Sequence, residues 1–285
     1  MNNNSLRKIL IFGFLLYIQI IKAQLNQPEI YGHRGFRGKF PENSILGFQK
    51  AIELGITGIE LDVVVNKDKQ LVISHEPFFQ KEYCLDSIGK EIKNESDFNI
   101  YHLNQKEIEL FDCGTKFHSK FPDQFKIKSV KPLLQTFFTE VNLINTIILF
   151  EVKSEFKEYN VSQPEPDEYS NIILDELKNF KYKSNIRIMC FDAEILEQIH
   201  KKDPSYPLVY LTYLPKSSNN FLKKLSFKPY ALGMFYPTIN NRSANQLHQK
   251  NIKLFSWTVN DLKQKEKMMN LGVDAIITDF PDVFK

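Results

Sequence analysis

The sequence predicts an α/β protein: a TIM (β/α)8 barrel with a small insertion after a hairpin on the second strand. Short apolar segments rich in β-branched residues alternate with helical patterns along the 285 residues, and this alternation favours a parallel sheet with helices outside. A chain of this length is usual for one barrel domain. Polar side chains stand at the ends of several predicted strands, where barrel enzymes carry their functional residues.

Nine segments have the composition of strands, and helical patterns lie between most of them. The strand segments are 30–33, 58–65, 71–74, 146–152, 186–190, 207–212, 231–235, 252–258 and 275–278. The helical segments are 44–54, 133–143, 168–179, 192–201, 242–249 and 261–270. In the first helix, Asn43 or Ser44 can cap the start and Gly55 ends it.

Nine strands are one too many for this barrel, and a short connection explains the extra one. Only residues 66–70 join the second strand segment to the third. A parallel crossover needs about a dozen residues or more, so residues 63–65 and 71–74 must pair antiparallel. The hairpin leaves the top of the barrel and returns, which brings His75 close to the rim.

Residues from about 76 to 130 form the insertion, which is polar and has weak periodicity. We expect it to fold as a small cap beside the rim. Cys84 and Cys113 lie in the insertion and could form a disulfide, although three unpaired cysteines fit the sequence equally well. The third cysteine is Cys190, and no pair of cysteines has the spacing of metal ligands.

Residues 1–23 have the pattern of a secretory signal peptide. Arg7 and Lys8 precede the apolar stretch ILIFGFLLYIQII, and the small residue Ala23 stands at a suitable cleavage point. We therefore expect one barrel domain over residues 24–285, exported to the periplasm or secreted. The apolar stretch is short for a membrane span, which needs about 20 residues. We expect no stable membrane insertion after the signal is removed, and an uncleaved anchor is the alternative.

The net charge of the chain limits the classes of partner that we expect it to bind. A net charge of +3 without a basic cluster gives no sign of the strongly basic face that nucleic-acid-binding proteins present. We therefore expect a small-molecule substrate and no nucleic acid. The sequence leaves the oligomeric state open.

Residues that can carry chemistry stand at the ends of several predicted strands or directly after them. They are His33 and Arg34, Glu60 and Asp62, His75, Glu151 and Lys153, Trp257, and Asp279. Residues i and i+2 of a strand share a face, so the carboxylates of Glu60 and Asp62 should point the same way. We expect the whole set to meet at the carboxyl-terminal rim of the barrel.

Five ordered motifs resemble the glycerophosphodiester phosphodiesterase (GDPD) family. They are HRGFRGKFPENS, GIELDVVVNKDKQLVISHEP, FEVK, SWTVN and GVDAIITDFP, and the resemblance extends over most of the chain. It implies a GDPD-type TIM barrel, similar to phospholipase C-like phosphodiesterases, and a divalent metal. It also implies hydrolysis of glycerophosphodiesters to sn-glycerol 3-phosphate and an alcohol. The family's usual His-Asp pair is His75-Glu76 here, which concerns the alcohol specificity more than the chemistry.

The residue types fit this chemistry. Three carboxylates, those of Glu60, Asp62 and Glu151, make an all-oxygen site for a hard cation such as Ca²⁺ or Mg²⁺. His33 and His75 titrate near neutrality, so one can accept a proton while the other donates one to the leaving alkoxide.

Three further residues are expected to contact the substrate. Arg34 and Lys153 are predicted to bind the phosphate, although Arg34 could instead pair structurally with Glu42. Trp257 is either core filler or a wall against the glycerol moiety. The other four histidines are interpreted as non-catalytic, and they are His102, His118, His200 and His248.

Two other functions stay open. A metal-independent phosphatidylinositol phospholipase C-like enzyme uses a similar barrel and histidine pair, but it would leave the carboxylate cluster without a cation to offset the repulsion. A non-catalytic binding protein on the same barrel should have lost a histidine or a metal ligand, and neither loss is visible. The leaving alcohol, the native metal and the assignment of acid and base to the two histidines also stay open.

Overall fold

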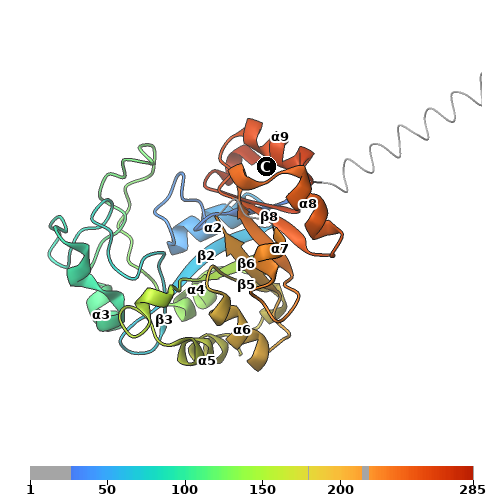
Figure 1. The fold of residues 1–285 in the computed structure, drawn as a ribbon. Helices are drawn as coiled ribbons and strands as arrows, with labels where there is room; N and C mark the ends of the chain where they lie inside the picture. Colours follow the sequence, from blue (N-terminus) through green and yellow to red (C-terminus); the bar gives the residue numbers. More distant parts are fainter. Residues whose placement is uncertain (1–26, 179, 214–217, 285) are drawn as a thin grey trace, which may run out of the picture.

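Eight parallel strands close into a barrel in the computed structural model, which describes residues 27–178, 180–213 and 218–284 (Figure 1). The barrel strands are β1 (Glu29–Gly32), β2 (Gly58–Val65), β4 (Ile147–Val152), β5 (Ile186–Cys190), β6 (Leu208–Thr212), β7 (Ala231–Phe235), β8 (Lys253–Trp257) and β9 (Ala275–Thr278). β1 pairs in parallel with both β9 and β2, and this double pairing closes the ring. The predicted TIM barrel is confirmed.

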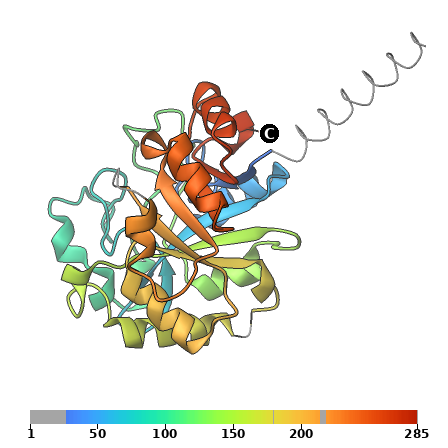
Figure 2. The ribbon, with the colours of Figure 1, turned by 45° about the vertical axis from the view of Figure 1, so that its right-hand side comes forward.

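Helices surround the barrel on its outside in both views of the ribbon (Figures 1 and 2). They are α2 (Ile45–Glu53), α4 (Leu134–Glu140), α5 (Pro166–Leu177), α6 (Ala193–Lys202), α7 (Ser218–Leu222), α8 (Asn241–His248) and α9 (Leu262–Asn270). All six helices predicted in the sequence are present, with bounds that match within about three residues at each end. The helix α7 was not predicted. Among the described residues, no helix is long and apolar enough to span a membrane.

The predicted hairpin is present. β3 (Leu71–Ile73) pairs antiparallel with the end of β2, with Val63 opposite Ile73 and Val65 opposite Leu71. The first six residues of β2, Gly58 to Val63, pair in parallel with β4, so that Val63 pairs with both neighbouring strands. The first part of β2 therefore belongs to the barrel, and its last part, residues 63–65, forms the hairpin with β3 above the rim.

The insertion lies to one side of the barrel, from cyan to green in both ribbon views. Its regular structure is limited to the 3-10 turns η1 (Glu95–Phe98) and η2 (Ile100–His102) and the four-residue helix α3 (Gln105–Ile108). It has a small core of its own, which includes Phe79, Ile92 and Phe111.

A disulfide joins Cys84 to Cys113 within the insertion. The sequence left this pairing open, and the structure contains it. Cys190 is a buried free thiol at the end of β5. The disulfide ties together two stretches of irregular backbone that few regular hydrogen bonds would otherwise hold.

Alternation along the barrel strands separates two cores. Tyr31, Leu149 and Phe255 belong to the cluster that fills the inside of the barrel. Leu61 and Val63 belong to the other cluster, which packs the strands against the surrounding helices. Since neighbours on a strand point to opposite faces, Glu60 and Asp62, which alternate with these two residues, must face the inside.

Candidate active site

Three carboxylates from β2 and β4 meet inside the barrel near its carboxyl end. One oxygen from each of Glu60, Asp62 and Glu151 lies within 4.8 Å of the others. The residues are 1%, 0% and 8% exposed, respectively. Among the described residues, Glu60 Oε1 and Asp62 Oδ1 are buried and have no hydrogen-bond partner. Buried, unpartnered carboxylate oxygens at this spacing are what a hard divalent cation needs, so these residues fit a metal.

Mutual repulsion in this cluster falls mainly on Glu60. Burial, together with the charges of Asp62 and Glu151, raises the pKa of Glu60 well above its usual range. Burial would also raise the pKa of Asp62, but His75, Arg34 and other positive groups hold it below its usual value. Without a cation, the pKa of Glu60 is shifted toward the protonated form, and the charge of a bound metal would oppose that shift.

His33 follows β1 and is held by a carboxylate from the other end of the chain. Its Nδ1 lies 2.6 Å from Asp279 Oδ1, and Asp279 Oδ2 accepts a hydrogen bond of 2.7 Å from the Asn260 amide. Burial would raise the pKa of Asp279, but the adjacent His33 and Arg37 keep it below its usual value. The ionised Asp279 accepts a hydrogen bond from Nδ1–H of His33. This leaves Nε2, which lies 4.0 Å from Glu60 Oε2, facing the carboxylate cluster.

His75 has the same kind of partner. Its Nδ1 lies 2.6 Å from Glu76 Oε1. Burial would raise the pKa of Glu76, but the contact with His75 lowers it below its usual value. Both histidines therefore have Nδ1 bound to a carboxylate and Nε2 left for other contacts. The residue that departs from the family's usual pattern, Glu76, performs this contact.

Arg34 occupies a constrained turn directly above the carboxylates. Its φ is +51°, a left-handed conformation that is uncommon for a side chain of this size. Its backbone N–H donates to Glu60 Oε2 over 2.8 Å. A Cβ atom on Gly32 would stand 2.2 Å from the carbonyl oxygen of Gly35, so only glycine fits there.

The guanidinium of Arg34 contacts two carboxylates and also lines the cavity described below. Its Nη1 donates to Glu42 Oε1 over 2.8 Å, and its Nε lies 3.3 Å from Asp62 Oδ2. The structural pair with Glu42 is therefore present. Asn43, which the sequence offered as a helix cap, donates instead to Asp62 Oδ2, and Ser44 caps α2.

Lys153 and Trp257 complete the predicted set. Lys153 Nζ donates to Glu151 Oε1 over 2.6 Å and lies 3.7 Å from Asp62. Trp257 packs edge-on against Phe191 with ring centres 5.4 Å apart. Its indole Nε1 is buried and has no hydrogen-bond partner among the described residues.

Two adjoining cavities open at this end of the barrel. The smaller, of about 250 Å³, is lined by His33, Arg34, Arg37, Glu60, His75, Glu151, Lys153, Met189, Phe191, Leu211, Trp257, Thr258 and Ile277. The larger, of about 780 Å³, extends over residues 154–158 and 162–163. His75, Glu151, Lys153 and Phe191 line both. All residues predicted to catalyse, to bind the metal or to contact the substrate line the smaller cavity except Asp62, which lies in the carboxylate cluster beside Glu60 and Glu151.

Sequence reasoning missed the residues that hold the predicted ones in place. Asp279 was noted at the end of its strand without a partner, and Asn260 and Tyr83 were not noted at all. Glu76 was noted only as a departure, although its position next to a candidate histidine was a usable signal. His118, one of the histidines interpreted as non-catalytic, stacks on Tyr83 in the insertion, at 5.1 Å between ring centres.

A site at the carboxyl ends of the strands places the chain among the (β/α)8-barrel enzymes. Within that class, the model of the glycerophosphoryl diester phosphodiesterase family matches residues 33–283. The chain belongs to this family and is thus an enzyme of the phosphoric diester hydrolase class. The resemblance found in the sequence is confirmed. The family generally uses a divalent metal, and the acidic cluster fits one.

Individual relatives agree over nearly the full length. The chain is 29% identical over 253 residues to a glycerophosphodiester phosphodiesterase of Caldanaerobacter subterraneus. This alignment covers 89% of the present chain and 94% of the relative. A putative glycerophosphoryl diester phosphodiesterase of Silicibacter pomeroyi superposes with a TM-score of 0.80 at 22% identity, covering 90% and 91% of the two chains. A phosphodiesterase of Oleispira antarctica, solved with its product sn-glycerol-3-phosphate, gives 0.73 at 19% identity, covering 90% and 94%.

Proposed function

We propose that the protein hydrolyses glycerophosphodiesters to sn-glycerol 3-phosphate and an alcohol, and that it requires Ca²⁺ or Mg²⁺. The observation that carries the proposal is the buried cluster of Glu60, Asp62 and Glu151 beside two carboxylate-paired histidines. The product bound to the Oleispira relative supports the glycerophosphate half of the substrate. The three carboxylates hold the cation, and a bound cation supplies positive charge for the phosphate oxygens.

Arg34 and Lys153 bind the non-bridging phosphate oxygens in this proposal. Arg34 presents a planar fork whose charge cannot be lost at neutral pH. Burial would lower the pKa of Lys153, but Glu151 and Asp62 raise it above its usual value, so this side chain also stays charged. Trp257 forms a wall of the smaller cavity, and its indole N–H is available to a hydroxyl of the glycerol.

The two histidines transfer the protons. Asp279 and Glu76 hold the protons on Nδ1, so that Nε2 of each ring exchanges a proton with the substrate. His33 lines only the smaller cavity, whereas His75 lines both. This difference supports placing the glycerophosphate in the smaller cavity and the leaving alcohol in the larger, with His75 as the acid that protonates the alcohol and His33 as the base.

Hydrolysis of a panel of glycerophosphodiesters, with and without chelator, tests this function. We expect turnover that EDTA abolishes and Ca²⁺ or Mg²⁺ restores, and loss of turnover in Glu60→Gln. Glu266→Gln is the matched control because Glu266 is exposed on α9 and distant from the site. Full activity after exhaustive chelation would favour the metal-independent phospholipase C-like alternative. Absence of turnover on every substrate with metal present would favour a binding protein.

We also propose that the protein works outside the cytoplasm. The predicted signal peptide, residues 1–23, lies outside the described residues. The Cys84–Cys113 disulfide supports an oxidising compartment, because disulfides persist in exported proteins and are rare in the cytosol.

A further inference from the structure

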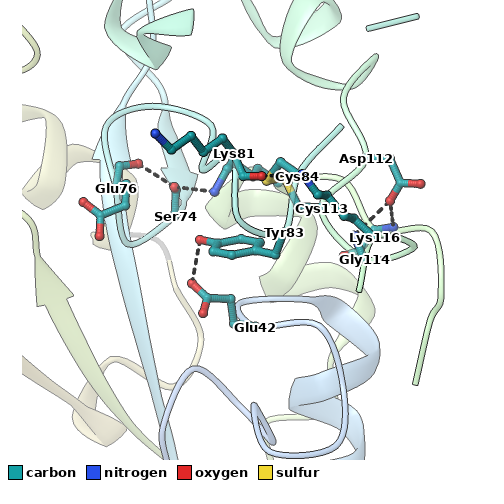
Figure 3. The surroundings of a disulfide bond; sticks show 12 residues. Glu42, Ser74, Glu76, Lys81, Tyr83, Cys84, Asp112, Cys113, Gly114 and Lys116 are labelled. Carbon is teal, nitrogen blue, oxygen red and sulfur yellow. Dashed lines mark hydrogen bonds between the residues drawn. A yellow bond between two sulfur atoms is a disulfide. The ribbon is translucent and has the colours of Figure 1, made fainter. Parts of the chain in front are cut away.

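Tyr83 of the insertion reaches the loop that carries the predicted phosphate-binding arginine. Its hydroxyl donates to Glu42 Oε1 over 3.0 Å, and Figure 3 shows the Tyr83 ring between this carboxylate and the disulfide. Both side chains are removed from solvent, with Tyr83 6% exposed and the Glu42 side chain 5% exposed. A buried hydroxyl aimed at a carboxylate is a directional contact between two segments far apart in the sequence.

Glu42 in turn holds Arg34. Glu42 Oε1, which accepts from Tyr83, also accepts from Arg34 Nη1 over 2.8 Å. Glu42 Oε2 lies 2.8 Å from Arg37 Nε. Burial would raise the pKa of Glu42, but Arg34 and Arg37 hold it well below its usual range. The carboxylate is therefore ionised, and Tyr83 fixes the oxygen to which Arg34 is bound.

Such fixation matters for a flexible arginine. An unrestrained guanidinium must lose rotamer freedom when it binds phosphate, and this loss weakens binding. Tyr83 and Glu42 impose the position before the substrate arrives. Their contribution should therefore appear in ground-state affinity for a phosphate compound more than in the chemical step.

Tyr83 is itself held from several directions. The next residue, Cys84, is bonded to Cys113. Leu85, which follows Cys84, and Asp112, which precedes Cys113, exchange two backbone hydrogen bonds of 2.7 and 3.3 Å. The ring stacks on His118 with an interplanar angle of 12°. Since the insertion has little regular structure, the disulfide is the covalent constraint nearest to this contact.

We propose that Tyr83 is a positioning residue for Arg34, acting through Glu42, and that the Cys84–Cys113 disulfide keeps Tyr83 in place. The insertion is then a working part of the phosphate site. This inference rests on the proposed function, which assigns Arg34 to the phosphate.

Tyr83→Phe tests the first half, because it removes the hydroxyl and keeps the ring on His118. The matched control is Tyr101→Phe, the same change elsewhere in the insertion, where the ring lies against Lys69. Calorimetric binding of sn-glycerol 3-phosphate in the presence of Ca²⁺ gives Kd without turnover. We expect Tyr83→Phe to raise Kd, and KM for a glycerophosphodiester, by about fivefold or more, with kcat changed by less than about twofold. Tyr101→Phe should change neither.

Removal of the disulfide tests the second half. The double variant Cys84→Ala/Cys113→Ala should raise Kd about as much as Tyr83→Phe, and the triple variant should lose little more, because both changes act on one contact. If the double variant does not fold, the folded wild type and Tyr83→Phe are compared before and after a phosphine reductant. Reduction should then weaken binding only in the wild type.

The outcomes separate this inference from the proposed function. A wild type that binds sn-glycerol 3-phosphate, with Tyr83→Phe binding it equally well, overturns the role of Tyr83. The role of the disulfide is overturned if the increases in Kd from the cysteine changes and from Tyr83→Phe multiply in the triple variant. It is also overturned if reduction weakens binding equally in the wild type and in Tyr83→Phe. A wild type that neither binds sn-glycerol 3-phosphate nor hydrolyses any glycerophosphodiester overturns the proposed function itself.

Discussion

Replacing Asp279 by asparagine tests whether the carboxylate on His33 sets the state of that histidine. Asn260 Nδ2 donates to Asp279 Oδ2 over 2.7 Å, and in Asp279→Asn this donor still requires an acceptor. The new amide must therefore turn its carbonyl oxygen toward Asn260 and its NH₂ group toward His33 Nδ1. An N–H facing Nδ1 forces the ring proton onto Nε2, where the proposed base needs a free electron pair.

The expected loss can be worked from the contact that is removed. The contact between His33 Nδ1 and Asp279 is a charge-assisted hydrogen bond of 2.6 Å. Such bonds contribute about 1.5–3 kcal/mol, which corresponds to a factor of about 10 to 160 in rate. The wrong tautomer adds to this loss, so we expect kcat to fall by about 100-fold or more.

The pH dependence has a definite sign. Burial lowers the pKa of His33, and Asp279 partly opposes that effect. Removing the carboxylate should lower the pKa further, so the limb of the kcat/KM profile that His33 controls should move to lower pH.

Steady-state hydrolysis of a glycerophosphodiester across pH is the assay, with saturating Ca²⁺ or Mg²⁺. Asp282→Asn is the control, because it removes an exposed carboxylate three positions further along the chain. If Asp279→Asn kept wild-type kcat within about threefold and an unshifted pH profile, the carboxylate would not set the tautomer of His33, and the assignment of His33 as base would lose its support.

Four further outcomes are expected. Because burial and like charges raise the pKa of Glu60, Ca²⁺ or Mg²⁺ binding should release a proton and strengthen as pH rises, which calorimetry in buffers of different ionisation enthalpy measures. His33→Ala and His75→Ala should each lower kcat by about 100-fold or more, and an activated nitrophenyl ester should partly rescue the His75 variant, whose missing proton a good leaving group does not need. Gly32→Ala should lower both the melting temperature and activity, since its Cβ would stand 2.2 Å from a carbonyl oxygen. Mass spectrometry of exported protein should show that residues 1–23 or so have been removed.

Each of these outcomes has a contrary result. Metal binding without proton uptake or release would mean that Glu60 is already ionised in the free enzyme. Equal rescue of both histidine variants would contradict the division of acid and base. Gly55→Ala, where an added Cβ meets nothing within 4 Å but a φ of +71° strains any side chain, gives the cost of that strain without a clash. A melting temperature of Gly32→Ala no lower than that of Gly55→Ala would contradict the clash at Gly32. An intact Met1 in exported material would favour an uncleaved anchor.

The barrel could be predicted from the sequence because its strands are continuous apolar runs whose ends are clearly marked in the sequence. Every residue of β2 is buried, and its predicted bounds, 58–65, are those observed. The length of the connection at residues 66–70 decided between parallel and antiparallel pairing for β3. α7 was missed because its five residues, SNNFL, are too few and too polar to show a helical period.

Contacts between distant segments could not be predicted. His33 and Asp279 are 246 positions apart, and nothing in one sequence states that two strand ends share a hydrogen bond. The partner of Tyr83 depends on the path of the insertion, whose buried residues, such as Phe79, Ile92 and Phe111, lie on irregular backbone without a repeating pattern. Strand periodicity predicts which side chains face inward, and it gives no information about which loops meet above them.

The two ends of the insertion lie side by side. The backbone N–H of Ile73 donates to the carbonyl of Pro132 over 2.8 Å, and Lys131 Nζ donates to Ser74 Oγ over 2.7 Å. The chain therefore leaves the hairpin and returns to the same point, so the number of residues between does not alter the register of the barrel. Evolution can lengthen, shorten or exchange this segment as an independent unit, under one condition: a replacement must supply Glu42 with another buried donor.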